Sequence, residues 1–132
     1  MKQVAKLVLI NKNNEYLMLF RSNHPVFGND PDLPGGTIEG DETDLRAVVR
    51  EVEEEAGITV DESKLSRLYS GTDYSKSGTN YSLFKANLEK NPVINLSWEH
   101  SSYQWLDRDN FLKLAAKAND SYMLMVYDKL KD

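Results

Sequence analysis

The hydrophobic positions of this chain change their period along its length, and each period predicts a type of element. Residues 4–10 and 15–20 are apolar almost throughout and flank a polar Asn-Lys-Asn-Asn stretch, which predicts a β-hairpin. Residues 64–72 and 80–88 have strand character, and the second of them alternates apolar with polar side chains. Residues 101–106 indicate a further short strand. Together these segments predict a β-sheet.

Other segments repeat apolar residues every three or four positions, as one face of a helix does. In the longest of them the apolar stripe consists of Leu45, Val48, Val49, Val52 and Ala56. Asp41 or Thr43 can cap the start of this helix. Residues 107–118, which begin at a capping aspartate, and residues 123–130 repeat the helical spacing. With the strands, these helices predict an α/β fold, in which a mixed sheet carries helices on both sides.

The longest predicted helix also carries three carboxylates on one side. Glu51, Glu54 and Glu55 stand at i, i+3 and i+4, so their side chains are neighbours and repel one another. A solvated helix face usually interleaves Lys or Arg four residues away, yet only Arg46 and Arg50 are near. Glutamates late in a helix also oppose the helix dipole. A hard divalent cation is the simplest compensation, because Mg²⁺ prefers carboxylate and carbonyl oxygens, and a solvated face is the alternative.

Length and composition narrow the class of protein. The 132 residues, 40% of them hydrophobic, suit one domain with one core over residues 1–132. The net charge of −5 and the lack of a dense Lys/Arg block argue against duplex nucleic acid as a partner. The absence of cysteine excludes disulfides, thiol catalysis and zinc–thiolate sites. Because no apolar stretch approaches the roughly 18 residues of a membrane helix, we expect a soluble, cytoplasmic protein without a membrane partner.

The stretch from Gly36 to Ile58 resembles the complete signature of the Nudix hydrolase family. It reads Gly36, five residues, Glu42, seven residues, Arg50-Glu51-Val52, one residue, Glu54-Glu55, one residue, Gly57-Ile58. At roughly one in fifteen per specified position, an accidental match has a chance of about 10⁻⁸ per starting point. The resemblance implies an α/β/α sandwich with a mixed sheet. It also implies hydrolysis of a nucleoside diphosphate linked to another group, with a small-molecule nucleotide as substrate.

The resemblance further implies roles for individual residues. Glu51, Glu54 and Glu55 are similar to the glutamates that bind Mg²⁺ or Mn²⁺ in this family, with the carbonyl of Gly35 as a further ligand. Arg50 resembles the residue that orients one of these carboxylates. Either Glu51 or Glu54 can serve as general base, and family members differ in which residue does so. A metal ion can neutralise phosphate oxygens and activate the attacking water, which agrees with the chemistry of pyrophosphate cleavage.

Residues before and after this signature are candidates for contacting the substrate. Arg21 follows the second predicted strand and can reach a phosphate as a fork of donors, or it is an ordinary surface arginine. His24 and Phe27, in the polar loop predicted from Ser22 to Asp32, can touch a base or are plain loop residues. Tyr74 lies where a tyrosine in Nudix enzymes points weakly to dinucleoside polyphosphates. With seven tyrosines in the chain, coincidence is the alternative.

The run from Leu96 to Asp107 resembles the corresponding stretch of animal-type diadenosine tetraphosphate hydrolases, in which an acid–histidine pair precedes a tyrosine and a tryptophan. Glu99 is therefore a candidate metal ligand or base from outside the signature, and a loop carboxylate is the alternative. We expect His100 to be a hydrogen-bonded structural histidine and Trp105 to belong to the core. Glu42 resembles an acid that supports the metal site, or a ligand for an additional metal once substrate is bound.

The sequence therefore predicts a Mg²⁺-dependent Nudix pyrophosphohydrolase. Nucleoside triphosphates or dinucleoside polyphosphates are the favoured substrates, and a sugar nucleotide is less favoured, because ADP-ribose-cleaving members often have a proline after the signature that this chain lacks. Two alternatives stay open. One is a non-catalytic Nudix-fold module that binds or senses a nucleotide, against which the intact glutamates argue. The other is an acidic structural domain without a ligand. Homodimers exist in the family, but no stretch here indicates an interface.

Overall fold

The computed structural model describes residues 2–21, 30–118 and 120–132. In chain order the elements are β1 (Gln3–Ile10), β2 (Tyr16–Arg21), β3 (Pro31–Asp32), β4 (Gly35–Thr37), α1 (Asp44–Ala56), the short 3₁₀ helix η1 (Glu62–Lys64), β5 (Ser66–Gly71), β6 (Asn80–Asn87), β7 (His100–Leu106), α2 (Arg108–Lys117) and α3 (Ser121–Leu130). The hairpin, the later strands and all three predicted helices are therefore confirmed, with bounds that differ by a few residues.

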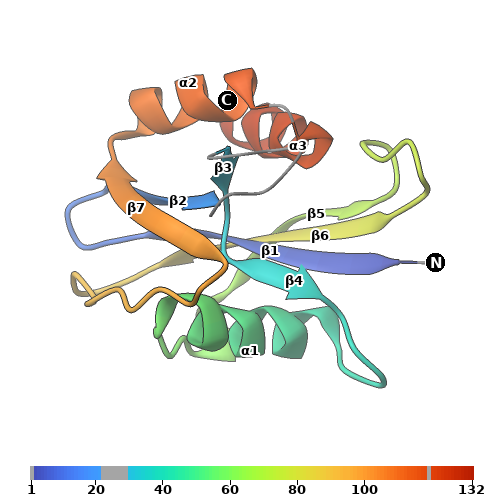
Figure 1. Ribbon diagram of the computed structural model, residues 1–132, viewed down its shortest axis with the longest axis horizontal. Helices are drawn as coiled ribbons and strands as arrows, with labels where there is room; N and C mark the ends of the chain where they lie inside the picture. Colours follow the sequence, from blue (N-terminus) through green and yellow to red (C-terminus); the bar gives the residue numbers. More distant parts are fainter. Residues whose placement is uncertain (1, 22–29, 119) are drawn as a thin grey trace.

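The strands form one mixed sheet in the order β3-β2-β1-β6-β5, with β4 paired to β1 and β7 paired to β2. β1 and β6 run parallel, from Gln3 opposite Asn80 to Ile10 opposite Asn87. The other pairs are antiparallel. Helix α1 covers one face of the sheet, and α2 and α3 cover the other (Figure 1). This arrangement confirms the predicted α/β/α sandwich.

Strand β1 shows why both faces of the sheet need a helical layer. Ala5, Leu7 and Leu9 join the apolar cluster under α1, whereas Val8 and Ile10 join the cluster under α2 and α3. Successive side chains of a strand point to opposite faces, and all five of these are at most 4% exposed. Burying each of the four larger side chains, those of Leu7, Val8, Leu9 and Ile10, stabilises the fold by about 1.5–3 kcal/mol. A strand that is apolar almost throughout, as β1 is apart from Lys6, is therefore the mark of a sheet that is covered on both faces.

Helix α1 is defined at both ends by local hydrogen bonds. The side chain of Thr43 accepts a hydrogen bond from the backbone N–H of Arg46, so Thr43 is the cap and not Asp41. Gly57 ends the helix in the left-handed region, at φ 69°, and donates its N–H to the carbonyl of Glu53. Of the predicted stripe, Val48, Val52 and Ala56 are fully buried, and Leu45 and Val49 pack against the same cluster.

Two short strands correct the sequence prediction. The sequence predicts a loop as far as Asp32 and a glycine turn after it, but Pro31–Asp32 forms β3 and Gly35–Thr37 forms β4. Both pair through their backbones, β3 with β2 and β4 with β1. Strands of two or three residues are too short to show an alternation of apolar and polar side chains, so the pattern could not reveal them. The candidates His24 and Phe27 lie outside the described residues.

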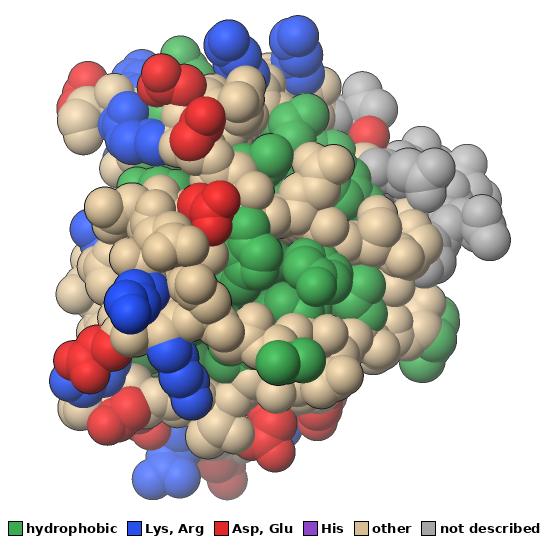
Figure 2. Space-filling view, turned by 90° about the vertical axis from the view of Figure 1, so that its left-hand side faces the viewer, with side chains coloured by type: hydrophobic (Ala, Val, Ile, Leu, Met, Phe, Trp, Pro, Cys, Tyr) green, Lys and Arg blue, Asp and Glu red, His purple; other side chains and the backbone are tan. Residues whose placement is uncertain are grey.

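Seen from the side at which β7 ends, hydrophobic side chains gather in the middle of the surface, with charged side chains to the left, above and below (Figure 2). The top of this view is the side on which α2 and α3 lie, and the bottom is the side on which α1 lies. In the part of the chain that the structure describes, no helix has both the length and the apolar character that a membrane span requires.

Candidate active site

The two glycines of β4 bring a backbone segment close to helix α1. A Cβ on Gly36 would lie 2.6 Å from the carboxyl carbon of Glu51, so the missing side chain leaves room for this carboxylate. Gly35 has φ +138°, and a Cβ there would collide with the backbone of Ala5 and Lys6 in the neighbouring β1. The sheet therefore requires glycine at position 35, whereas a side chain at position 36 would have to push the carboxylate of Glu51 aside.

Two carboxyl groups of α1 lie in surroundings that oppose their ionisation. Glu55 is 3% exposed and accepts a hydrogen bond of 3.2 Å from the backbone N–H of Gly35. Burial raises the pKa of Glu55 to about 8. Burial also raises the pKa of Glu51, and the nearby charge of Glu54 adds to this effect. A cation between Glu51 and Glu55 would stabilise their ionised forms and so lower both pKa values.

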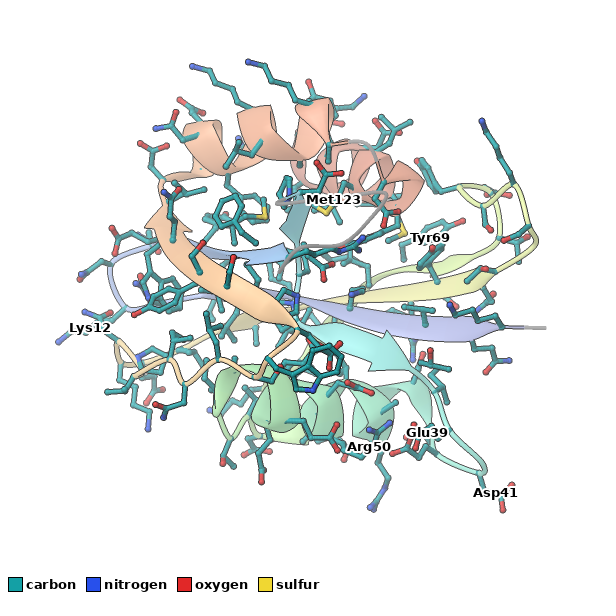
Figure 3. All side chains as sticks on the ribbon, in the orientation of Figure 1. Lys12, Glu39, Asp41, Arg50, Tyr69 and Met123 are labelled. Atoms are coloured by element: carbon teal, nitrogen blue, oxygen red, sulfur yellow. The ribbon has the colours of Figure 1, made fainter. Side chains whose placement is uncertain are left out.

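The guanidinium of Arg50 contacts the more exposed carboxylates near α1. Its guanidinium donates to Glu42 at 2.7 and 2.9 Å, to Glu51 at 3.1 Å and to Glu54 at 3.3 Å. The hydrogen bond from Arg50 lowers the pKa of Glu42 to about 2. Arg50 and Glu39 lie side by side, close to the loop whose tip carries Asp41 (Figure 3). Arg50 therefore donates to three carboxylates at once, those of Glu42, Glu51 and Glu54.

A hollow of about 320 Å³ is lined by Glu55 of α1 and by residues from other elements. The lining residues come from β1, β2, β3, β4, α1, the connection before β7 and the start of β7: Lys6, Arg21, Asp32, Gly35, Glu55, Trp98, Glu99 and His100. The fold thus brings together four of the sequence candidates, Arg21, Gly35, Glu55 and Glu99, from positions far apart in the chain. A larger hollow of about 490 Å³, formed by residues around 59–64 and 86–90, has no buried polar side chain in its lining.

Behind the hollow lies a buried ionic cluster around Asp32, which is 4% exposed. Lys6 Nζ lies 3.1 Å, His100 Nε2 2.9 Å and Arg21 Nη2 3.4 Å from its carboxylate, and the hydroxyl of Tyr122 donates to it as well. Burial by itself would raise the pKa of Asp32. The charge of Lys6 and the hydrogen bond with His100 outweigh burial and hold that pKa well below its ordinary value. Asp32 is therefore ionised and holds two cations at the wall of the hollow.

Sequence reasoning missed most of this cluster. The one available signal was Lys6, a charged residue inside an otherwise apolar strand, which had to find a buried partner. Nothing in the local pattern marked Asp32 or Tyr122. His100 is hydrogen-bonded and 5% exposed, as expected of a structural histidine. Trp105 packs partly buried against the cluster under α1.

The remaining two candidates lie in different surroundings. Arg21, at the end of β2, reaches the hollow and also pairs with Asp120 at 3.0 Å. Tyr74 donates its hydroxyl to Asp128 of α3 at 2.9 Å, and its ring lies edge-on to Tyr69, with 5.5 Å between the ring centroids. Tyr74 is not among the lining residues of the hollow. The fold therefore does not bring it together with the glutamates.

Backbone hydrogen bonds tie the connection before β7 to the end of α1. The N–H of Asn95 donates to the carbonyl of Ala56 at 2.9 Å, and the N–H of Ser97 donates to the carbonyl of Glu55 at 3.0 Å. The last carbonyls of a helix have no partner within the helix, and these two amides satisfy them. Glu99, two residues further on, is thereby held near the glutamates of α1.

The oxygen donors at this site suit a hard divalent cation. They are the carbonyl of Gly35 and the carboxylates of Glu51, Glu54, Glu55 and Glu99, the ligand types that Mg²⁺ and Mn²⁺ prefer. The raised pKa values of Glu51 and Glu55 also indicate that compensating positive charge is short there. Among the residues described, no three acidic or histidine side chains already converge as a metal cage, and Arg50 holds two of these carboxylates. The donor set fits the ion in its chemistry.

Comparison with known proteins shows which family and which fold this chain resembles. The family model of the NUDIX domain matches residues 1–126 of this chain. An 8-oxo-dGTP diphosphatase from Escherichia coli (strain K12) is 44% identical over 57 residues, which are 43% of this chain and 44% of that protein. An ADP-ribose pyrophosphatase from Methanocaldococcus jannaschii is 42% identical over 65 residues, 49% of this chain and 38% of that protein. The chain thus spans less than half the length of these curated relatives in the matched regions.

Among solved structures, the binary complex of an Ap4A hydrolase from C. elegans is similar over nearly the whole chain. The match covers 95% of each chain, with a TM-score of 0.66 and 26% identity. The overall arrangement of strands and helices is therefore shared with that structure from end to end.

Proposed function

This chain belongs to the Nudix family, and we propose that it is a Mg²⁺- or Mn²⁺-dependent pyrophosphohydrolase. The bond cleaved is a phosphoanhydride in a nucleoside diphosphate that is linked to another group. One observation carries the proposal: Glu55 of α1, Gly35 and Glu99 line a hollow whose wall also presents Lys6 and Arg21. Acidic ligands for a metal ion and cations for phosphate oxygens are the two requirements of this reaction.

Glu51, Glu54, Glu55, Glu99 and the Gly35 carbonyl would hold the metal ion. Nudix enzymes generally use divalent metals. The bound ion would neutralise phosphate oxygens and lower the pKa of a water molecule. Glu51 or Glu54 would then accept the proton of the attacking water.

The basic residues of the site have separate tasks in this proposal. Arg50 donates to Glu51 at 3.1 Å and would keep that carboxylate directed toward the metal ion. Arg21 and Lys6, both bound to Asp32, would present their charge to the phosphates of the substrate. Because Asp32 already fixes their positions, little side-chain entropy remains to be lost when phosphate binds.

Nucleoside triphosphates and dinucleoside polyphosphates are the proposed substrates. The relatives named as 8-oxo-dGTP diphosphatase and Ap4A hydrolase support these two classes. Because another relative is named as an ADP-ribose pyrophosphatase, ADP-ribose is included among the substrates to be tested. Tyr74, which donates to Asp128, adds nothing to the support for dinucleoside polyphosphates. That class depends on the run from Leu96 to Asp107 instead.

The test is a hydrolysis panel in Mg²⁺ with separation of the products. It compares diadenosine tetraphosphate, ordinary and oxidised nucleoside triphosphates, and ADP-ribose. Glu54→Gln should abolish turnover. Glu53→Gln is the matched control, because Glu53 is exposed on the same helix and has no place in the proposed metal site. ATP plus AMP from diadenosine tetraphosphate would identify a dinucleoside polyphosphate hydrolase, whereas monophosphate plus pyrophosphate would identify a triphosphate enzyme.

The alternative is a nucleotide-binding module without catalysis, and metal-dependent stability separates the possibilities. A metal ion at 100 times its Kd stabilises the folded protein by about 2.7 kcal/mol, and Glu55→Gln should remove this gain. A gain without turnover of any substrate would favour the binding module. The absence of both would contradict the metal site itself.

A further inference from the structure

One large aromatic side chain stands almost free of the protein at the rim of the hollow. Trp98 is 87% exposed, more than the other exposed large hydrophobics among the described residues, Val93, Tyr103 and Leu124, which are 78%, 40% and 52% exposed. The second tryptophan, Trp105, packs against the cluster under α1. Tryptophan is highly buried on average, so a nearly bare indole next to charged groups needs a reason.

Trp98 is also chemically unlike the rest of the lining. The other lining residues among those described are charged or polar, apart from one glycine: Lys6, Arg21, Asp32, Gly35, Glu55, Glu99 and His100. They can hold a metal ion and phosphate groups, but they offer no flat apolar surface. Trp98 alone supplies such a surface in this lining, and a nucleobase has a face of the same kind.

The size of the hollow places the base at its rim. About 320 Å³ is near the lower end of the roughly 300–1,000 Å³ of small-molecule sites. In the proposed function, the charged residues of the lining bind the metal ion and the phosphates, and they fill the hollow with these groups. The nucleoside must therefore extend outward from the hollow, past the exposed indole of Trp98.

The backbone on both sides of Trp98 is held in place. Before it, Ser97 donates its N–H to the carbonyl of Glu55. After it, Glu99 donates its N–H to the hydroxyl of Ser97 at 3.4 Å, and His100 is buried against Asp32. The loop that carries the indole is thus attached to α1, the helix that carries the glutamates. A surface held in this way loses little conformational entropy when a ligand stacks on it.

We propose that Trp98 is the surface on which the nucleobase of the substrate stacks. This proposal rests on the proposed function and defines its substrate class further: phosphoanhydrides that carry a planar aromatic group are preferred over phosphoanhydrides without one. Stacking depends little on the identity of the base, because every base has a π-face. Trp98 therefore selects for a base in general, and discrimination between bases comes from other contacts.

The test compares ligands with and without a base. Calorimetric titrations in Mg²⁺ would use methylene-bridged, non-hydrolysable analogues of ATP and GTP, with inorganic tripolyphosphate as the base-free probe. Trp98→Ala should weaken both nucleotides by about 5- to 150-fold, the range for losing one base–aromatic stack. Tripolyphosphate should change less than about twofold. Trp98→Phe should keep most of the affinity, and Val93→Ala is the matched control, an exposed apolar residue of the same connection outside the hollow.

A spectroscopic readout reports on the indole directly. In the Trp105→Phe background, the only remaining tryptophan is Trp98. Its emission should be quenched by the nucleotide analogues and left unchanged by tripolyphosphate. Quenching by both ligands would indicate that the loop responds to phosphate alone and would contradict stacking.

Failure of this proposal can be told apart from failure of the proposed function. Equal losses for nucleotides and tripolyphosphate in Trp98→Ala would assign the residue to the stability of its loop, and unchanged nucleotide affinity would remove it from the site. In both cases, metal-dependent hydrolysis by the wild-type protein would leave the proposed function standing. A wild-type protein without turnover and without metal-dependent nucleotide binding would overturn both.

Discussion

Replacing Asp32 with asparagine removes the negative charge at the centre of the buried cluster. Lys6, which is 8% exposed, and Arg21 would then face a neutral amide. Burial lowers the pKa of Lys6, but the charge of Asp32, the charge of Glu55 and the hydrogen bond to Asp32 together outweigh burial, so that the pKa of Lys6 is raised in the native protein. Without Asp32, the lysine must either stay charged and unpaired or give up its proton.

The expected loss follows from the burial of this pair. Removing one partner of a buried ion pair costs about 3–5 kcal/mol, because it leaves the other charge uncompensated. At roughly 2.1 cal/mol/K of unfolding entropy per residue, a chain of 132 residues loses about 3.6 °C of Tm per kcal/mol. The Tm of Asp32→Asn should therefore fall by about 11–18 °C.

The assay is thermal and urea unfolding followed by circular dichroism. Asp41→Asn is the matched control, because Asp41 is exposed at the tip of the loop before α1 (Figure 3) and the same change there should stay within about 0.5 kcal/mol. The double variant Lys6→Met with Asp32→Asn removes both charges together. It should lose about 0.5–3 kcal/mol less than the sum of the single variants, since residues in one ionic network are coupled.

Two results would refute this reasoning. A loss below about 1 kcal/mol for Asp32→Asn would mean that the buried lysine does not need its partner. Additive losses in the double variant would mean that Lys6 and Asp32 stabilise the fold independently, whatever the 3.1 Å between them.

Further predictions concern the site and the ends of α1. Gly36→Ala should abolish metal-dependent turnover with little change in far-UV circular dichroism, because the new Cβ displaces the carboxylate of Glu51; normal turnover would contradict the role of that glutamate. Thr43→Ala should lower the free energy of unfolding by about 1 kcal/mol in urea titrations, since it removes the cap that accepts from Arg46, and Thr59→Ala serves as the exposed control. The contribution of Asp32 to stability should be complete above its ordinary pKa of 3.8 and should be lost as the pH falls through its lower pKa in the folded state. Urea midpoints between about pH 2 and 6 would show this dependence, and it should shrink in Asp32→Asn.

The sequence predicted best where the relevant residues are neighbours in the chain. Helix α1, its stripe and its terminal Gly57 all follow from spacings of three or four residues and from local capping. The apolar run of β1, interrupted by Lys6, likewise depends on a single strand, whereas the predicted alternation of β6 gives way to three consecutive buried residues, Ser82 to Phe84. For α1 and β1 the physical cause of the structure lies within one element, and the pattern records it.

The ionic cluster could not be predicted because its members are distant in sequence. Asp32 meets Lys6, His100 and Tyr122 across 26, 68 and 90 residues. The order of strands in the sheet and the packing of α3 on the sheet bring them together, and periodicity determines neither. Lys6, a charged residue within the apolar run of β1, indicates that a buried partner exists but not which residue it is.

Candidates outside the signature illustrate the same limit. Glu99 and Tyr74 were both proposed from their positions relative to a family pattern. The backbone bonds to the end of α1 bring Glu99 to the hollow, whereas the hydrogen bond to Asp128 holds Tyr74 against α3. Position in the chain alone did not separate them, because the tertiary contacts of each residue decide where its side chain lies.

The amides of Asn95 and Ser97 divide the connection between β6 and β7 into two parts with different tolerance to insertion. Residues after Asn95 take their place from α1, so their position does not depend on the length of chain that leads to them. Before it, residues 91–93 are mostly exposed, and a longer loop costs only about 0.6 kcal/mol per doubling of its length. A reporter peptide or an affinity tag inserted at residues 91–93 would therefore leave Trp98 and Glu99 where they are.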